Sequence, residues 1–202
     1  MAQHEAPTPS FGAHIGDPGP LGLAGFAAAT FFLSAVNAGL LAAGVEAGVL
    51  GLAIFYGGIA QLLAGMWEFT KGNTFGATAF ASYGAFWLSF WWLIEKSKLV
   101  GSAHDVNHGI GTYLLIWTIF TAYMFIASLR TTGAVAAVFL VLALTFLFLA
   151  IGAYKGDAAG DGLTEVGGWL GLVTAVIAWY TSFAGVTNST FKKTVLPTFP
   201  LG

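Results

Sequence analysis

The run GAVAAVFLVLALTFLFLAIG, at Gly133–Gly152, decides the fold of this chain. Thr145 carries the only polar side chain in the run, and no residue in it is charged. An α-helix rises about 1.5 Å per residue, so roughly 20 apolar residues cross the ~30 Å hydrocarbon core of a bilayer. Because that core offers no water to the backbone, such a run is stable there as a helix that bonds its own peptide groups. The run therefore predicts a transmembrane helix.

Five other stretches of similar length and apolarity lie on either side of this run. Together the predicted membrane spans are Leu21–Leu41, Gly48–Trp67, Phe75–Ile94, Ile110–Leu129, Gly133–Gly152 and Val166–Val186. The 202 residues are 57% hydrophobic and 8% charged, whereas ordinary soluble domains are about 25% charged. The sequence therefore predicts an all-α polytopic membrane protein in which six transmembrane helices form one bundle.

The organisation along the chain follows from these spans. We expect an N-terminal tail with a helix-start motif (1–20), a six-helix transmembrane domain (21–187) and a C-terminal tail (188–202). The connections at 42–47 and 70–74 are short, which predicts hairpins and makes the first three spans neighbours. Lys and Arg number four on the N-terminal side of the membrane and three on the other side. This difference weakly favours a multi-pass protein of the cell membrane with both termini in the cytoplasm.

Neutral polar side chains recur at helical spacing inside four of the predicted spans. They include Thr30, Asn37, Gln61, Thr121 and Thr181, each on the same helical face as other small or polar residues. Hydrogen bonds between helices would account for any one of them, but stripes on several helices at once favour a lined pathway. No predicted span carries a charged residue or a histidine near its centre. The lining therefore suits a small polar or weakly anionic solute better than a cation.

The ionisable and nucleophilic side chains give little support for catalysis. His104 and His108 have the i, i+4 spacing of a helical metal site, but they fall in a predicted polar loop without a third ligand nearby. Ser82 has no neighbouring histidine or carboxylate to activate it, and Glu68, at a span end, is expected to pair with Lys71. We expect no enzyme activity, no metal and no cofactor. The net charge of −2 gives no reason to expect a nucleic-acid partner.

Two regions of the chain carry distinctive motifs. One is Asp17-Pro18-Gly19-Pro20-Leu21-Gly22-Leu23, and the other runs from Phe55-Tyr56-Gly57-Gly58-Ile59-Ala60-Gln61 through Lys71–Gly76 to Ser82-Tyr83-Gly84. Both resemble the acetate uptake transporter family, whose bacterial members are called succinate–acetate permeases. The family signature at the first motif is Asn-Pro-Ala-Pro-Leu-Gly-Leu. The resemblance extends from about Asp17 to Pro197.

This resemblance implies a fold, an assembly and a constriction. The fold is a six-helix bundle around a pore, the assembly is a homohexamer with one pore in each protomer, and acetate and, in many members, succinate pass through. In the family a Phe, a Tyr and a Leu form a narrow hydrophobic constriction. The matching positions here are Phe26, Tyr83 and Leu142, and Asn37 matches a family asparagine.

The chain departs from the family signature at the start of the first span. There the N–H groups of a helix N-terminus would attract a carboxylate, which predicts a mouth of the pathway near Pro18, Leu21 and Gly22. Asp17 stands where the family has asparagine. Aspartate can still cap the helix, but its negative charge opposes an approaching anion.

The function predicted from the sequence is a membrane channel or permease for acetate and similar small carboxylates, with succinate as a larger substrate. Its partners are then the carboxylate, the lipid bilayer and other copies of the chain. A channel for small neutral amides or urea is the alternative within the same class, because a charge-free lining serves it equally well. A membrane subunit that transports nothing is the alternative from another class. The sequence leaves open whether transport is passive or coupled to protons.

Overall fold

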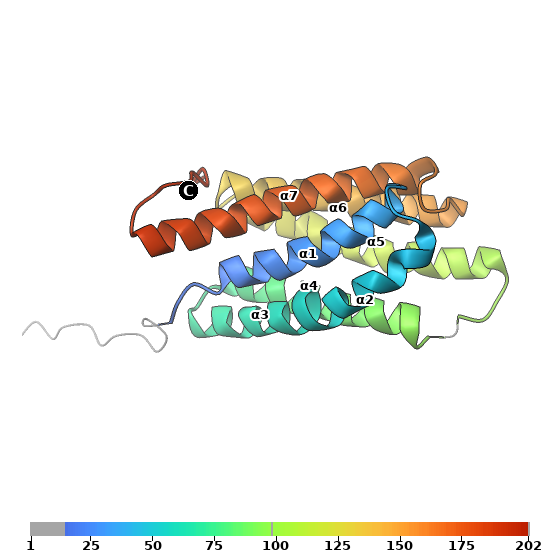
Figure 1. Cartoon of the computed structure of the whole chain (residues 1–202), viewed down its shortest axis with the longest axis horizontal. Coiled ribbons are helices and arrows are strands. Elements are labelled where there is room, and N and C mark those ends of the chain that lie inside the picture. Colours follow the sequence, from blue (N-terminus) through green and yellow to red (C-terminus); the bar gives the residue numbers. More distant parts are fainter. Residues whose placement is uncertain (1–14, 98, 202) are drawn as a thin grey trace, which may run out of the picture.

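The computed structural model describes residues 15–97 and 99–201. Its helical segments are α1 (Gly19–Asn37), η1 (Ala43–Gly48), α2 (Val49–Gly51), η2 (Leu52–Ala60), α3 (Gln61–Thr70), α4 (Thr74–Glu95), α5 (Ala103–Ser128), α6 (Gly133–Lys155) and α7 (Gly162–Phe191). The four segments from η1 to α3 follow one another as a single span. Figure 1 shows one elongated bundle in which the long helices run side by side. The all-helical fold class is confirmed.

Five of the described spans are long and apolar enough to cross a membrane. They are α1, the continuous span Ala43–Thr70, α5, α6 and α7. The remaining predicted span, α4, has 22 residues, but its aromatic, glycine and hydroxyl residues lower its mean hydropathy. It lies inside the bundle against α3 and η2 (Figure 1). The chain is therefore a multi-pass membrane protein, and α4 completes the set of six spans.

The second span begins earlier and is less regular than the sequence predicts. The short connection is found and the first three spans are neighbours, as expected. It begins before 42–47, because Gly39, with φ +73°, already ends α1 and turns the chain. The amide of Val45 then donates to the carbonyl of Ala42 (3.0 Å), and the 3₁₀ helix η1 begins. Further along, η2 is a π-helix. There Gly57 lies so close to α1 that an added Cβ would be 2.9 Å from the Cβ of Ala29.

The start of α5 also differs from the prediction. The helix begins at Ala103 rather than Ile110, because Ser102 and Asp105 form a capping box. The amide of Asp105 donates to Oγ of Ser102 (3.2 Å), and the amide of Ser102 donates to Oδ2 of Asp105 (3.0 Å). His104 and His108 therefore lie in the first turns of a helix. Their assignment to a loop is wrong.

Neighbouring helices pack closely through glycine. α1 lies between α7 and the second span, α6 lies between α5 and α7, and α3 packs on α4. A Cβ added to Gly65 would lie 2.5 Å from the backbone nitrogen of Ala81, and one added to Gly168 would overlap the backbone of Ala38. Helices in lipid gain stability from such close backbone contact. These glycines therefore hold the bundle together.

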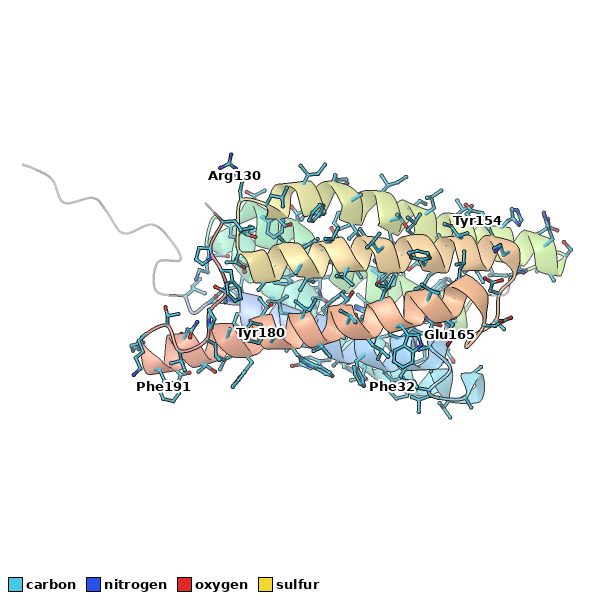
Figure 2. The ribbon with its side chains drawn as sticks, turned by 90° about the horizontal axis from the view of Figure 1, so that it is seen from above. Phe32, Arg130, Tyr154, Glu165, Tyr180 and Phe191 are labelled. Carbon is cyan, nitrogen blue, oxygen red and sulfur yellow. The ribbon has the colours of Figure 1, made fainter. Side chains whose placement is uncertain are left out.

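The two ends and the outer faces of the bundle differ in polarity. Figure 2 places Arg130 near one end and Glu165 toward the other. The outer faces expose large apolar side chains such as Phe55, Ile126 and Phe183, which are 68%, 69% and 61% exposed. A bilayer or a neighbouring subunit would cover such faces.

The start of α1 and the C-terminal segment lie at the same end of the bundle (Figure 1).

Candidate functional site

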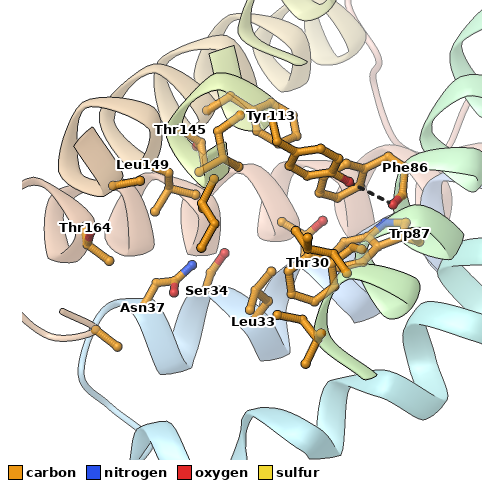
Figure 3. Close-up of a pocket in the computed structure, with 18 of the residues that line it drawn as sticks. Thr30, Leu33, Ser34, Asn37, Phe86, Trp87, Tyr113, Thr145, Leu149 and Thr164 are labelled. Atoms are coloured by element: carbon orange, nitrogen blue, oxygen red, sulfur yellow. Dashed lines mark hydrogen bonds between the residues drawn. The ribbon is translucent and has the colours of Figure 1, made fainter. Parts of the chain in front are cut away.

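A cavity of about 390 Å³ reaches from one end of the bundle into its middle (Figure 3). This volume falls within the range of small-molecule sites, about 300–1,000 Å³. At one end its lining includes Asn37, Asn107 and Thr164, which lie near helix ends remote from the start of α1. Towards the middle the lining includes Thr30 and Trp87. The cavity therefore follows the long axis of the bundle, as a transport pathway would.

Large apolar side chains close the inner end of the cavity. Phe26 of α1 and Leu142 of α6 line it there and are 4% and 3% exposed. Tyr83 of α4 lies outside the lining, with its ring centroid 5.6 Å from that of Phe26. The structure thus gathers the three residues matched to the family constriction into one core cluster. Their role in narrowing a pore stays a prediction.

The hydroxyl of Tyr83 is already bonded within the protein. It lies 2.8 Å from Oγ1 of Thr121, and Thr121 donates its own proton to the carbonyl of Trp117 (2.7 Å). Because a threonine hydroxyl carries a single proton, Tyr83 is the donor in the bond between the two side chains. Thr121 is fully buried and does not line the cavity. The pair is therefore satisfied internally.

One face of α1 supplies a ladder of polar groups to the cavity. Thr30, Ser34 and Asn37 all line it (Figure 3). The sequence predicted Thr30 and Asn37 but missed Ser34, although positions 30, 34 and 37 share one helical face. Gly171 of α7 leaves room for Ser34, because an added Cβ there would overlap the serine hydroxyl. The ladder runs from the end of α1 towards the closed inner end.

Two other predicted pathway residues lie inside the bundle and away from the cavity lining. Gln61 is 1% exposed. It follows Gly57 by one turn of the second span, and Gly57 packs against Trp87. Thr181 is 6% exposed and donates to the carbonyl of Ile177 (2.8 Å), so its own helix satisfies its hydroxyl. The structure brings neither residue to the cavity wall.

The helix-start motif lies at the opposite end and faces a different groove. Asp17 and Leu21 line an open groove of about 490 Å³ between α1, η2 and α7. Pro18 is buried, and a Cβ added to Gly22 would lie 2.5 Å from an aromatic ring of α4. The N-cap of α1 is Pro18, so the expected capping position of Asp17 is wrong by one residue. Oδ1 of Asp17 instead accepts the N–H of Gly19, the first residue of the helix (3.0 Å). The structure does not join this groove to the cavity.

Glu68 is buried at this same end, and its expected pairing with Lys71 is wrong. The side chain is 2% exposed and accepts a hydrogen bond from Nδ2 of Asn73 (2.8 Å). Asn73 in turn accepts the N–H of Gly76 (3.1 Å) at the start of α4. A Cβ on Gly19 would lie 3.6 Å from Oε1 of Glu68. The carboxylate thus sits between the N-terminal ends of α1 and α4, where helix dipoles favour negative charge.

Most polar groups of the site are neutral hydrogen-bonding groups. In the described part of the chain, no group of three or more His, Cys, Asp and Glu side chains could hold a metal ion. The rings of His104 and His108 stack with centroids 3.9 Å apart on the surface of α5. Asp157 is the one charged residue in the cavity lining, and its carboxylate accepts the N–H of Leu163 (2.8 Å).

A multi-pass helical bundle has here a long cavity that carries mostly neutral polar groups and ends at apolar side chains in the middle of the bundle. This arrangement is typical of membrane transport proteins. The chain belongs to the GPR1/FUN34/yaaH family, whose sequence profile matches residues 3–202. The family resemblance read from the sequence motifs is confirmed.

Curated relatives and a solved structure cover most of the chain. The succinate-acetate/proton symporter SatP of Escherichia coli is 40% identical over 183 residues, which are 91% of this chain and 95% of that protein. Accumulation of dyads protein 2 of Saccharomyces cerevisiae is 43% identical over 190 residues, which are 92% of this chain. The chain spans 66% of the length of that yeast protein. The structure described as the bacterial acetate channel SatP matches with a TM-score of 0.82 at 40% identity, over 91% of this chain and 99% of the other.

Proposed function

We propose that this chain is a membrane channel or permease for acetate and similar small carboxylates, with succinate as a larger substrate. The observation that carries the proposal is the polar face of α1, formed by Thr30, Ser34 and Asn37, inside a cavity that ends at Phe26 and Leu142. The names of the relatives, an acetate channel and a succinate-acetate/proton symporter, support the same class of substrate.

The lining suits an ion that must be held weakly. An anion at the centre of a bilayer costs at least a few kcal/mol unless other groups replace its lost hydration. Hydroxyl and amide donors replace part of that hydration, and they attract the ion less strongly than Lys or Arg would. Conduction needs sites that an ion can also leave. The described lining contains no Lys or Arg, which favours passage over tight binding.

Phe26, Tyr83 and Leu142 form the constriction of the proposed pathway. They belong to one buried core cluster, in which the ring centroids of Phe26 and Tyr83 are 5.6 Å apart and Leu142 lines the cavity with Phe26. Large apolar side chains in contact leave no space for a hydrated ion, and such constrictions gate by excluding water. Movement of these side chains would therefore open the path.

The assembly and orientation of the chain belong to the same proposal. Family resemblance supports a homohexamer with a pathway in each protomer and no catalytic activity. The exposed apolar faces, which include Phe55 and Phe183, support a surface shared between lipid and neighbouring protomers. The charge difference between the two sides of the membrane supports a cytoplasmic location for both termini.

Flux into liposomes tests the proposed function. Purified protein reconstituted in liposomes should carry labelled acetate faster than protein-free liposomes do. Leu142→Trp, which fills the inner end of the cavity, is the control for leakage and should abolish the difference. Passage of urea in place of acetate would favour the neutral-solute alternative, and passage of neither would favour a non-transporting subunit. Acetate accumulation driven by an imposed pH gradient would indicate coupling to protons.

A further inference from the structure

Three buried polar atoms in the described residues have no hydrogen-bond partner. They are Oγ1 of Thr30, Oε1 of Gln61 and Nε1 of Trp87. Buried polar groups are bonded in the great majority of cases, so each exception calls for an explanation. Thr30 and Trp87 both line the cavity. Figure 3 shows them together at its inner end, on α1 and α4, remote from Thr164.

Thr30 differs from the other buried threonines of the bundle. Those others are Thr121, Thr145, Thr174 and Thr181, and each donates to the carbonyl four residues earlier in its own helix. That bond is a common way for a helix to satisfy a threonine hydroxyl. The hydroxyl of Thr30 forms no such bond. Its proton is therefore available to a ligand.

The indole of Trp87 lies beside the same turn of α1. A Cβ added to Gly57 would be 2.8 Å from Cδ1 of Trp87 and 2.9 Å from the Cβ of Ala29, the residue before Thr30. Thr30 and Trp87 line the same cavity, and Figure 3 shows the indole beside Thr30. An indole N–H donates but cannot accept. It needs an acceptor, and the carboxylate oxygen of a substrate in the cavity is one.

We propose that the Thr30 hydroxyl and the Trp87 indole N–H form a carboxylate-binding site at the inner end of the cavity, directly before the closure by Phe26 and Leu142. This proposal rests on the proposed function, and it names the two groups that bind the substrate. One carboxylate oxygen accepts the hydrogen bond from Oγ1 of Thr30, and the other accepts that from Nε1 of Trp87.

The site is closed in this structure, which bears on selectivity. Both donor atoms are buried, so an acid must displace the side chains that cover them. A carboxylate accepts two charge-assisted hydrogen bonds there, which are stronger than the neutral bonds that water accepts. A bound carboxylate therefore stabilises the arrangement in which the two donors are uncovered, and it does so more strongly than water. The pathway is thus expected to open when the substrate binds.

Thr30→Val tests the site with little change of shape. It removes an unpaired hydroxyl, so the melting temperature should hold or rise. Acetate flux at low concentration should fall roughly tenfold, the factor that corresponds to 1.4 kcal/mol. Thr30→Ser keeps the hydroxyl and should retain the flux. Trp87→Phe removes the N–H and should lower the flux by a similar factor.

Thr174→Val is the matched control. Its hydroxyl is bonded to the carbonyl of Leu170 (2.9 Å) and lies outside the cavity lining. This variant should therefore lower the melting temperature and leave acetate flux unchanged. Thr30→Val should thus lower flux and keep the melting temperature, whereas Thr174→Val should keep flux and lower the melting temperature.

The wild-type flux separates the two proposals. If wild-type liposomes carry acetate and both Thr30→Val and Trp87→Phe carry it equally well, the binding site is overturned while the proposed function stands. If the wild type carries no acetate, the proposed function fails and the site fails with it. A loss of melting temperature in Thr30→Val as large as that in Thr174→Val also overturns the site, because the hydroxyl would then have a structural partner.

Discussion

The hydroxyl of Tyr83 donates to Oγ1 of Thr121 across 2.8 Å and so joins α4 to α5 in the interior of the bundle. Thr121 donates its own hydrogen bond to the carbonyl of Trp117, and the chain of hydrogen bonds ends on the backbone of α5. Tyr83 and Thr121 are 3% and 0% exposed, so water does not compete for either bond. This hydrogen bond therefore links α4 to α5 beside the proposed constriction.

Tyr83→Phe should lower the free energy of unfolding by about 1 kcal/mol, because a buried hydrogen bond is lost. Thr121→Val should cost about 1–3 kcal/mol, because it leaves the buried phenol without an acceptor. The double variant should cost less than the sum of the two, since both changes remove the same bond. Unfolding in detergent measures all three. Strictly additive costs would contradict a direct bond between the side chains.

Phe26→Ala and Leu142→Ala should each raise the flux of succinate relative to acetate. Both side chains close the inner end of the cavity, and truncation of either leaves space there. Each change also removes buried apolar atoms at a cost of about 2–5 kcal/mol, so the flux ratio is compared per folded protein. Tyr83→Phe keeps its ring and is the control, with an unchanged ratio. Wild-type ratios in both alanine variants would exclude these two residues from the constriction.

Gly57→Ala and Gly51→Ala form a matched pair in the second span. The new Cβ at position 57 would crowd Trp87 and Ala29, and such overpacking costs about 1–3 kcal/mol. At Gly51 nothing lies within 4 Å of the new atom, so helix propensity alone acts and favours alanine by up to about 1 kcal/mol. Gly57→Ala should also displace the indole and lower acetate flux. Equal stability of the two variants would contradict the packing seen around η2.

The membrane spans could be predicted because each leaves a strong and local signal. The run at 133–152 is bounded by Thr132, whose side chain caps α6, and by Gly156, which ends the helix in a left-handed conformation. The π-helix η2 could not be predicted in the same way. Its geometry accompanies the packing of Gly57 and Gly58 against α1 and α4. Those contacts join residues far apart in the sequence.

The candidate site was predictable only in part. Helical periodicity placed Thr30 and Asn37 on one face, and Ser34 fits that periodicity although it was missed. Trp87 falls within the stretch that resembles the family, but neither periodicity nor residue type predicts a binding role for it, because an aromatic residue in an apolar helix resembles any core residue. Only the missing partner of its N–H distinguishes it. The inward position of Glu68 depends on the convergence of α1 and α4, which periodicity within one helix does not reveal.

Asp17→Asn should raise acetate flux, with the largest gain at low ionic strength. Asp17 is exposed, and its Oδ1 accepts the N–H of Gly19. An asparagine can accept the same bond from Gly19, so the stability should be kept. Loss of the charge lowers the repulsion of an approaching carboxylate, and salt screens such repulsion over ~8–10 Å at physiological ionic strength. Asp17→Ala is the control, which should gain similar flux but lose about 0.5–1.5 kcal/mol of stability with the bond to Gly19. A ratio of variant to wild-type flux near one at every salt concentration would contradict the electrostatic effect and leave Asp17 only its bond to Gly19.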